Sequence, residues 1–336
     1  MRRSHQPMTR ICDNLIRDQK SVWFFADQPE PLLDVDKPFR GLDSIYADVL
    51  PRDISLHVMP IGGQSEARKD FHVELEPADE ELTSIIAQAL ADQDGSYHSR
   101  DLRRVVCDFV RRVAARLIRY EHAAFEIVLL RDRHSNELTA CDLFEINVAT
   151  LSRDADGIIQ KVPPEVAVER KVPTIIHLDP DRLALFRLPP EFKNLRETKE
   201  ALSYLGGSAL FQMYEAAQAD DSLGYDAKNH IRAEHLATAA ATRSIGWNDN
   251  TTYYGLFSEY YVVHRRLTFE GFVIRLREAI LATLNEAVAK IAIECGKRAE
   301  LKVPGLPTLA DVNRAKAELA AGSRTFNSVL DDFSLL

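Results

Sequence analysis

One apolar stripe near the end of the chain constrains its fold more than any other feature of the sequence. Between residues 269 and 291 apolar side chains recur every three to four positions: Phe269, Phe272, Val273, Leu276, Ile280, Leu284, Ala287 and Ile291. This is the period of an amphipathic α-helix, and such a face usually packs in a core or against another helix. We therefore expect a long helix of about six turns with one buried side.

The residues before Pro189 predict a mixture of strands and helices. Alternating or continuous apolar runs predict short strands at residues 53–60, 71–75, 124–130, 138–149, 158–162, 174–178 and 183–186. Helices are expected after the acidic residues 77–81 and from Ser99, which we interpret as an N-cap. The helical period holds mostly from Pro189 to Lys297, and a last helix of about a dozen residues should follow Thr308. Strands first and long helices afterwards predict an α+β fold.

Charge is distributed unevenly along the chain. There are 42 Lys and Arg against 51 Asp and Glu, a formal net charge of −9, which argues against a protein that coats nucleic acid. Residues 74–94 contain seven acids and no Lys or Arg, whereas residues 100–119 contain seven arginines and two aspartates. The basic helix either faces phosphates or is an exposed face paired with the acidic helix before it.

A second basic segment, residues 265–277, lies at the start of the striped helix. The positive end of a helix dipole does not favour cations there, so we expect carboxylates of this chain or of a neighbouring chain to hold these arginines.

No motif in the sequence predicts an enzyme, a cofactor or a metal site. Residues 62–69 lack the spacing of a phosphate-binding loop, and His230, Glu234 and His235 lack the spacing of a metalloprotease helix. Strand residues Glu126, Asp142 and Glu145 resemble a nuclease carboxylate set only loosely. The four cysteines are scattered along the chain, which indicates reduced thiols: Cys12, Cys107, Cys141 and Cys295. We expect neither a secretory signal nor a membrane span.

Three segments carry a family resemblance. Residues 113–128 are similar to a helix that ends in Tyr-Gly-x-Ala/Ser and is followed by a strand reading aromatic-x-Glu-Ile-Val. Residues 143–189 are similar to a meander of strands that ends before a proline and long helices, and residues 265–277 to Arg-x-x-x-Phe-x-x-Phe-Ile-x-Arg-Leu-Arg. In this order they resemble portal proteins of tailed bacteriophages, the third segment those of contractile-tailed phages. Glu121 stands where the family usually has glycine, so we expect that turn to form differently here.

The resemblance implies a structural protein rather than an enzyme: a head–tail connector, a ring of twelve subunits at one capsid vertex, through which double-stranded DNA is packaged and ejected. The implied partners are the terminase large subunit, the head–tail adaptor, the major capsid protein and the scaffold protein. The implied location of the protein is the host cytoplasm during assembly and then the virion. Residues 1–45 would be an irregular arm, 46–188 a wing-like α/β domain, 189–300 a stem and channel region with a minimal clip near 219–229, and 301–336 a short tail helix.

In such a ring the acidic and basic segments would pair between neighbours, and arginines of both basic segments become candidates for the subunit interface or the DNA channel. These are Arg103, Arg104, Arg111, Arg112, Arg265, Arg266, Arg275 and Arg277. Reversing Arg111 and Arg112 to Glu is then expected to abolish ring assembly. Two alternatives remain open: a non-viral cytosolic helical scaffold from a prophage remnant or defence island, and, third, a metal-dependent nuclease.

Overall fold

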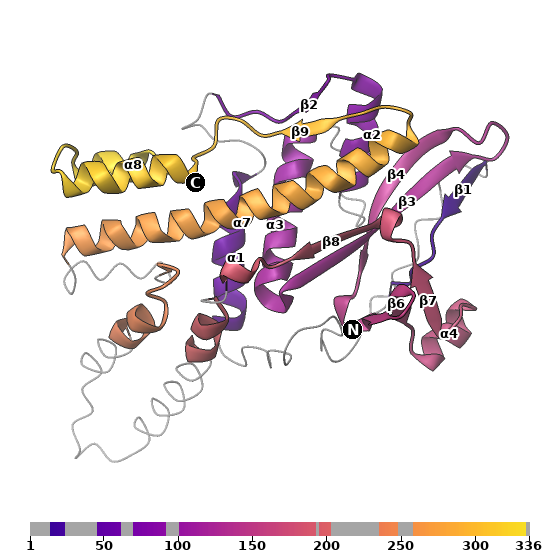
Figure 1. Cartoon of the computed structure of the whole chain (residues 1–336), viewed down its shortest axis with the longest axis horizontal. Coiled ribbons are helices and arrows are strands. Elements are labelled where there is room, and N and C mark those ends of the chain that lie inside the picture. Colours follow the sequence, from indigo (N-terminus) through magenta and orange to yellow (C-terminus); the bar gives the residue numbers. More distant parts are fainter. Residues whose placement is uncertain are drawn as a thin grey trace, which may run out of the picture.

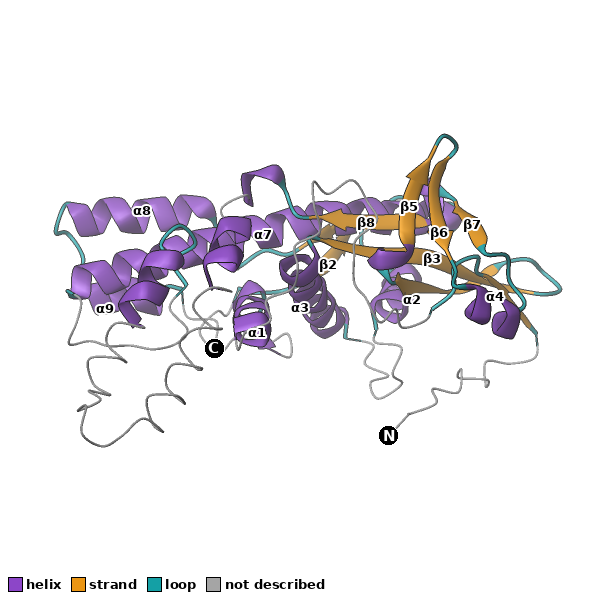
Figure 2. Ribbon diagram, turned by 90° about the horizontal axis from the view of Figure 1, so that it is seen from below, coloured by secondary structure: helices purple, strands orange, loops and turns teal. Residues whose placement is uncertain are grey.

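The computed structural model describes residues 14–23, 46–61, 70–91, 101–192, 195–202, 235–247 and 258–333. This part of the chain is 54% helix and 21% strand, with three small antiparallel sheets and one long helix, α7 (Glu259–Glu294). The expected α+β class is therefore confirmed. The strands gather at one end of the molecule, whereas α7, α8 (Leu309–Ala320) and α9 (Phe326–Asp331) extend to the other (Figure 2).

The largest sheet is built around β3 (His122–Asp132). On one edge β3 pairs with β4 (Leu138–Ile146) through the turn expected at residues 133–136. Its other edge is shared by two strands, β8 (Leu183–Arg187) beside residues 122–126 and β1 (Leu15–Asp18) beside residues 129–132. The expectation of an irregular arm over residues 1–45 is thus wrong for residues 15–18.

Two smaller sheets complete the strand content of the described residues. One consists of β5 (Leu151–Asp154), β6 (Gly157–Lys161) and β7 (Ile175–Leu178), with the short helix α4 (Pro164–Arg170) between the last two. The other pairs β2 (Glu74–Glu76) with β9 (Glu300–Lys302), and so ties a segment near the start of the chain to the segment that follows α7 (Figure 1).

In the described part of the chain, three helices precede β3. Asp79 caps α2 (Glu80–Leu90), and Asp101 caps α3 (Leu102–Tyr120); the expected cap Ser99 lies outside the described residues. The strand expected at residues 53–60 is wrong, because this segment belongs to α1 (Tyr46–Val58). Its fully buried side chains Leu50, Ile54 and Val58 are spaced by four residues, which is a helical spacing.

A continuous core joins the helices to the large sheet. Phe109, Phe125 and Phe186 form an aromatic cluster with ring centroids 5.0 to 5.9 Å apart. The apolar stripe of α7 is buried throughout and belongs to the same core, so the long helix packs directly on the α/β part. At its other end α7 packs against α8 and α9 in a separate small core. As expected, α8 begins after Thr308, which forms a capping box with Asp311.

Some expectations concern residues outside the described part of the chain: the clip near 219–229, the loop at 62–69, and His230 and Glu234. Among the described residues, no helix combines the length and the apolar character needed to cross a membrane.

Candidate functional site

The eight candidate arginines lie on two helices that pack together, four on α3 and four on α7. The eight side chains differ in how far they are buried. Arg265 and Arg277 are buried within the chain, Arg275 is exposed, and the other five are half-buried. They therefore do not form one continuous cationic surface.

Arg111 and Arg112 are tied to the interior of their own chain. Nε of Arg111 donates to the carbonyl oxygen of Ser55 in α1 at 3.2 Å. The guanidinium of Arg112 lies 5.3 Å from the ring centroid of Phe109 and 5.6 Å from that of Phe125. Reversing both charges would disturb the packing of α3 on α1 and on the core. Loss of assembly in that variant would consequently not identify an interface.

The other two candidates on α3 are more accessible. Nε of Arg104 lies 3.9 Å from Oδ2 of Asp108, a surface pair of the kind that contributes little to stability. Arg103 is half-exposed in the first turn of the helix, next to the cap residue Asp101. Both side chains can reach a partner without disturbing the core.

Arg265 holds two segments of the fold together. Its guanidinium donates to the carbonyl oxygen of Ala239 at 2.7 Å, to the carbonyl of Trp247 and to the hydroxyl of Thr242. Burial lowers the pKa of Arg265, and a hydrogen bond with Tyr261 raises it by a smaller amount. The expectation that carboxylates hold the arginines of this segment is wrong for Arg265, because backbone carbonyls near the end of the helical residues 235–241 take that role.

Arg266 and Arg277 also hold α7 to other parts of the same chain. The guanidinium of Arg266 lies 2.8 Å from Oε1 of Glu270, as expected, and 3.3 Å from Nε2 of His57 in α1. Arg277 donates to the carbonyl oxygen of Pro307, in the turn that precedes α8. Neither side chain is placed to contact a DNA phosphate without breaking these contacts.

Arg275 is the candidate that combines exposure with a cationic neighbour. Burial lowers the pKa of Lys316 on α8, and the nearby charge of Arg275 lowers it further. The two cations therefore lie close enough to repel each other across the α7–α8 contact. An anionic partner that covers both would relieve this repulsion.

The acidic segment is also used within the chain. Nζ of Lys297, just after α7, lies 2.8 Å from Oδ2 of Asp79 and 2.9 Å from Oε2 of Glu81. Hydrogen bonds to these two carboxylates raise the pKa of Lys297. On the basic helix, Nε of Arg116 lies 2.7 Å from Oε1 of Glu145 in β4. Part of the opposed charge is thus neutralised inside one subunit.

Glu121 is the C-cap of α3, at the junction with β3. Glu121 has a φ of 63°, the left-handed conformation that glycine usually supplies at the end of a helix. The expectation that this turn forms differently from a glycine turn is therefore wrong. The backbone keeps the glycine-type conformation although the residue has a side chain.

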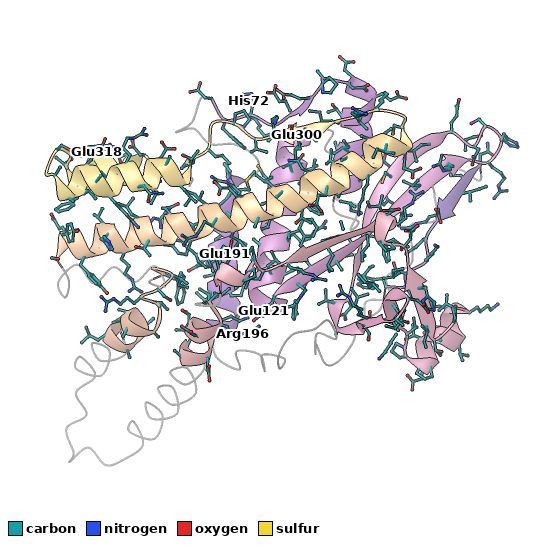
Figure 3. All side chains as sticks on the ribbon, viewed as in Figure 1. His72, Glu121, Glu191, Arg196, Glu300 and Glu318 are labelled. Carbon is teal, nitrogen blue, oxygen red and sulfur yellow. The ribbon has the colours of Figure 1, made fainter. Side chains whose placement is uncertain are left out.

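Ion pairs hold that side chain (Figure 3). Nε and an amino nitrogen of Arg196 donate to the Glu121 carboxylate at 3.2 and 2.5 Å. Burial alone would raise the pKa of Glu121, but the bonds from Arg196 and the charge of Lys199 hold it below its usual value. Burial lowers the pKa of Lys199 to about 8. The signal in the sequence was a pair of cations three residues apart, just after the strands end.

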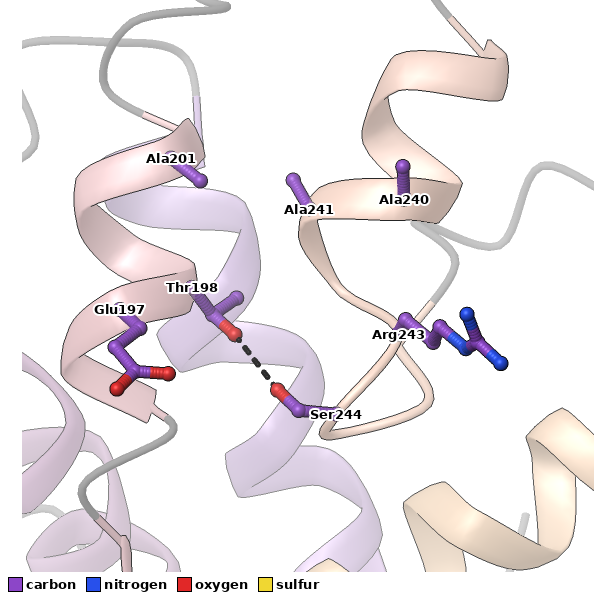
Figure 4. A pocket seen from close by; sticks show the side chains of 7 residues that line it. All are labelled: Glu197, Thr198, Ala201, Ala240, Ala241, Arg243 and Ser244. Carbon is purple, nitrogen blue, oxygen red and sulfur yellow. Dashed lines mark hydrogen bonds between the residues drawn. The ribbon is translucent and has the colours of Figure 1, made fainter.

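A cavity of about 580 Å³ lies between the helical residues 195–202 and the segment 235–244 (Figure 4). Thr198 and Ser244 form a hydrogen bond of 3.3 Å across it. The other lining residues are mostly alanines: Glu197, Ala201, Ala240, Ala241 and Arg243. The Arg243 guanidinium points away from the cavity. This lining offers a ligand few polar groups.

The carboxylates of the nuclease alternative do not converge. The β3–β4 register places Glu126 and Asp142 on one face of the sheet and Glu145 on the opposite face. The Glu126 carboxylate binds backbone N–H groups of residues 20 and 21, and Glu145 pairs with Arg116. Among the described residues no group of three or more His, Cys, Asp or Glu is arranged to hold a metal ion.

No protein-family model matches the chain, and no curated protein matches its sequence. The portal resemblance therefore depends on the three sequence segments alone.

We expect the free energy of unfolding to fall as the pH is lowered through 6.5. Burial lowers the pKa of His57, as does the charge of Arg266, and burial also lowers the pKa of His122. The unfolded chain therefore binds more protons than the folded chain just below pH 6.5. For each of the two histidines, the free energy of unfolding then falls by up to about 1.4 kcal/mol for every pH unit by which the pH is lowered. Urea denaturation between pH 7.5 and 5 measures this slope.

His57→Asn should reduce the slope, because an asparagine amide can still donate to the Asp53 carbonyl that His57 contacts but does not titrate. His134→Asn, in the exposed β3–β4 turn, is the matched control. An equal slope in His57→Asn and wild type would contradict this account.

Proposed function

We propose that the chain is a ring-forming structural subunit of the portal type, through whose channel double-stranded DNA passes. The observation that carries the proposal is the junction at Glu121. Residues 113–128 form the end of α3, a left-handed cap and the start of β3, which is the backbone path that a portal motif with glycine at the cap requires. The ion pair with Arg196 offsets part of the cost of a side chain there.

The order of the elements supports the same proposal. The strands of the large sheet end at Arg187 and helical residues follow. The third motif, residues 265–277, lies within the 36-residue helix α7, which is about 54 Å long at 1.5 Å per residue. In this proposal residues 46–188 form the wing-like part, 189–300 the stem and channel with a minimal clip near 219–229, and 301–336 the short tail.

The partners of the proposed function are further copies of the chain in a ring of twelve, the terminase large subunit, the head–tail adaptor, and the capsid and scaffold proteins. DNA would pass without sequence specificity. A net charge of −9 per subunit suits a channel wall that must not bind phosphates tightly. Of the eight candidate arginines, Arg103, Arg104 and Arg275 are accessible enough to contact a neighbouring subunit.

Mass photometry tests the ring. Twelve subunits of 37.9 kDa give a particle of about 455 kDa. Arg275→Glu should weaken each contact between subunits about tenfold, a change of about 1.4 kcal/mol per contact, and so lower the ring fraction at fixed concentration. The subunit should stay folded, because the new carboxylate lies near Lys316. Lys161→Glu, an equal reversal at an exposed residue of β6, is the matched control.

Purified protein that stays monomeric at all concentrations would contradict the proposal and favour the scaffold alternative. Normal rings of Arg275→Glu would remove Arg275 from the interface but leave the ring itself supported.

A further inference from the structure

Residues 14–22 of the arm bind to the sheet mainly through their backbone, and the Arg17 guanidinium adds an ion pair of 3.7 Å with Asp142 and a contact with the Phe144 ring. The four residues of β1 pair antiparallel with Leu129–Asp132 of β3. Just before β1, the carbonyl oxygen of Asn14 accepts a hydrogen bond from the N–H of Arg133 at 2.8 Å. The edge of β3 therefore accepts an added strand at the end that β8 leaves unpaired.

A buried glutamate binds the arm beyond β1. Glu126, only 4% exposed, accepts hydrogen bonds from the N–H groups of Lys20 and Ser21, each at 3.0 Å, and from the Ser21 hydroxyl. Within the described part of the chain, the arm supplies every hydrogen bond to this carboxylate. Departure of the arm would remove all three of these hydrogen bonds from the carboxylate.

A buried glutamine from the second sheet continues the contact. Gln160 of β6 is fully buried; its Oε1 accepts from the N–H of Val22 at 2.9 Å, and its Nε2 donates to the Val22 carbonyl at 2.8 Å. The amide thus contacts both backbone groups of Val22, as a neighbouring strand would. Glu126 and Gln160 together form a preformed site for an extended segment.

We infer that this strand-acceptor site, the edge of β3 with Glu126 and Gln160, takes residues 14–22 of a neighbouring copy in the assembled protein. The contacts are the same whichever copy supplies the arm, which makes such an exchange a low-cost route to assembly. The inference depends on the proposed ring only for the presence of neighbours.

The connection allows the exchange. Twenty-two residues separate Trp23 from Tyr46, the first residue of α1, and an extended chain of that length spans about 70 to 80 Å. That exceeds the length of α7, about 54 Å. In Figure 1 β1 lies beside the β3–β4 hairpin at one end of the molecule, whereas α1 lies near its middle, so even a copy that binds its own arm needs a long connection. Ile16 is 50% exposed and Trp23 38% exposed, which leaves apolar surface for a neighbour to cover.

Disulfide cross-linking in the full chain tests the exchange. Ile16 and Arg131 are Cα partners in the β1–β3 register, so Ile16→Cys and Arg131→Cys place two thiols within reach of each other. Chains carrying only Ile16→Cys are co-assembled with chains carrying only Arg131→Cys, oxidised and analysed without reductant. We expect a disulfide between different chains. Ile16→Cys with Thr139→Cys on β4, across β3 from β1, is the control pair and should not cross-link.

The double variant in one chain separates the outcomes. Covalent oligomers support the exchange, whereas an exclusively intrachain disulfide in assembled protein overturns it, as does the absence of any disulfide. Mass photometry of the same samples reports the ring independently. Rings with intrachain disulfides would refute only the exchange, and interchain disulfides without rings would refute only the ring.

A second measurement examines the role of the buried side chains. Glu126→Gln should lower interchain cross-linking about tenfold, because an amide N–H₂ then faces N–H donors. Glu286→Gln, which removes an exposed carboxylate of α7, is the matched control. If Glu126→Gln does not fold, Gln160→Leu, which removes both bonds to Val22, replaces it. Unchanged cross-linking in a folded variant would contradict the assigned role.

Discussion

Replacing Gly246 with alanine is expected to destabilise the subunit by about 3 to 4 kcal/mol. Gly246 has a φ of 76°, and a Cβ atom there would lie 2.4 Å from the carbonyl oxygen of Arg265 and 2.6 Å from the backbone nitrogen of Phe269. Both contacts are with the backbone of α7, which has no flexible end that can move aside. The variant must either displace the segment 242–247 or distort α7. Urea denaturation followed by circular dichroism measures the loss.

Gly296→Ala separates the steric effect from the conformational one. Gly296 has a similar φ of 67°, but a Cβ atom there meets nothing within 4 Å. Its substitution should cost only the left-handed conformation, about 1 kcal/mol. Equal losses for the two variants would show that the close approach of residue 246 to α7 contributes nothing to stability.

The close approach of Gly246 also positions the segment 235–247. This segment is fixed against α7 at Arg265, whose guanidinium bonds the carbonyls of Ala239 and Trp247 and whose own carbonyl lies close to Gly246. The ion pair between Arg196 and Glu121, the C-cap of α3, fixes the helical residues 195–202. The segments 195–202 and 235–247 are therefore both attached to the same core by specific contacts. A motion of either segment relative to the core would require these contacts to change.

Local signals in the sequence were sufficient for several elements. The acidic start of α2, the β3–β4 turn and the cap at Thr308 all depend on residues within one or two turns of each other. α1 was mistaken for a strand, because Ile54, Leu56 and Val58 alternate within a short window. Only its contacts with α3 and α7 show that Leu50, Ile54 and Val58 are the buried set.

The candidate site was predictable to the same extent. The Glu270 partner of Arg266 is one helical turn away, so the expected carboxylate was visible in the sequence. The main-chain groups that accept hydrogen bonds from Arg265 lie 18 and 26 residues earlier, and the one that accepts from Arg277 lies 30 residues later. They are backbone carbonyls, which every residue type provides, and no sequence pattern marks them. For this reason an arginine that holds the core together was indistinguishable from one that faces a partner.

Arg265→Met is expected to destabilise the subunit by about 3 kcal/mol, because the buried carbonyl groups of Ala239 and Trp247 lose their guanidinium donor. Arg275→Met is the matched control: the same substitution at an exposed residue of the same helix should change stability by no more than about 0.5 kcal/mol. Urea denaturation of the two variants measures the difference, and mass photometry of the folded protein adds the oligomeric state. If Arg265 serves the fold, its variant loses stability before any effect on assembly. An Arg265→Met subunit that is as stable as wild type but forms no ring would contradict this assignment and return Arg265 to the subunit interface.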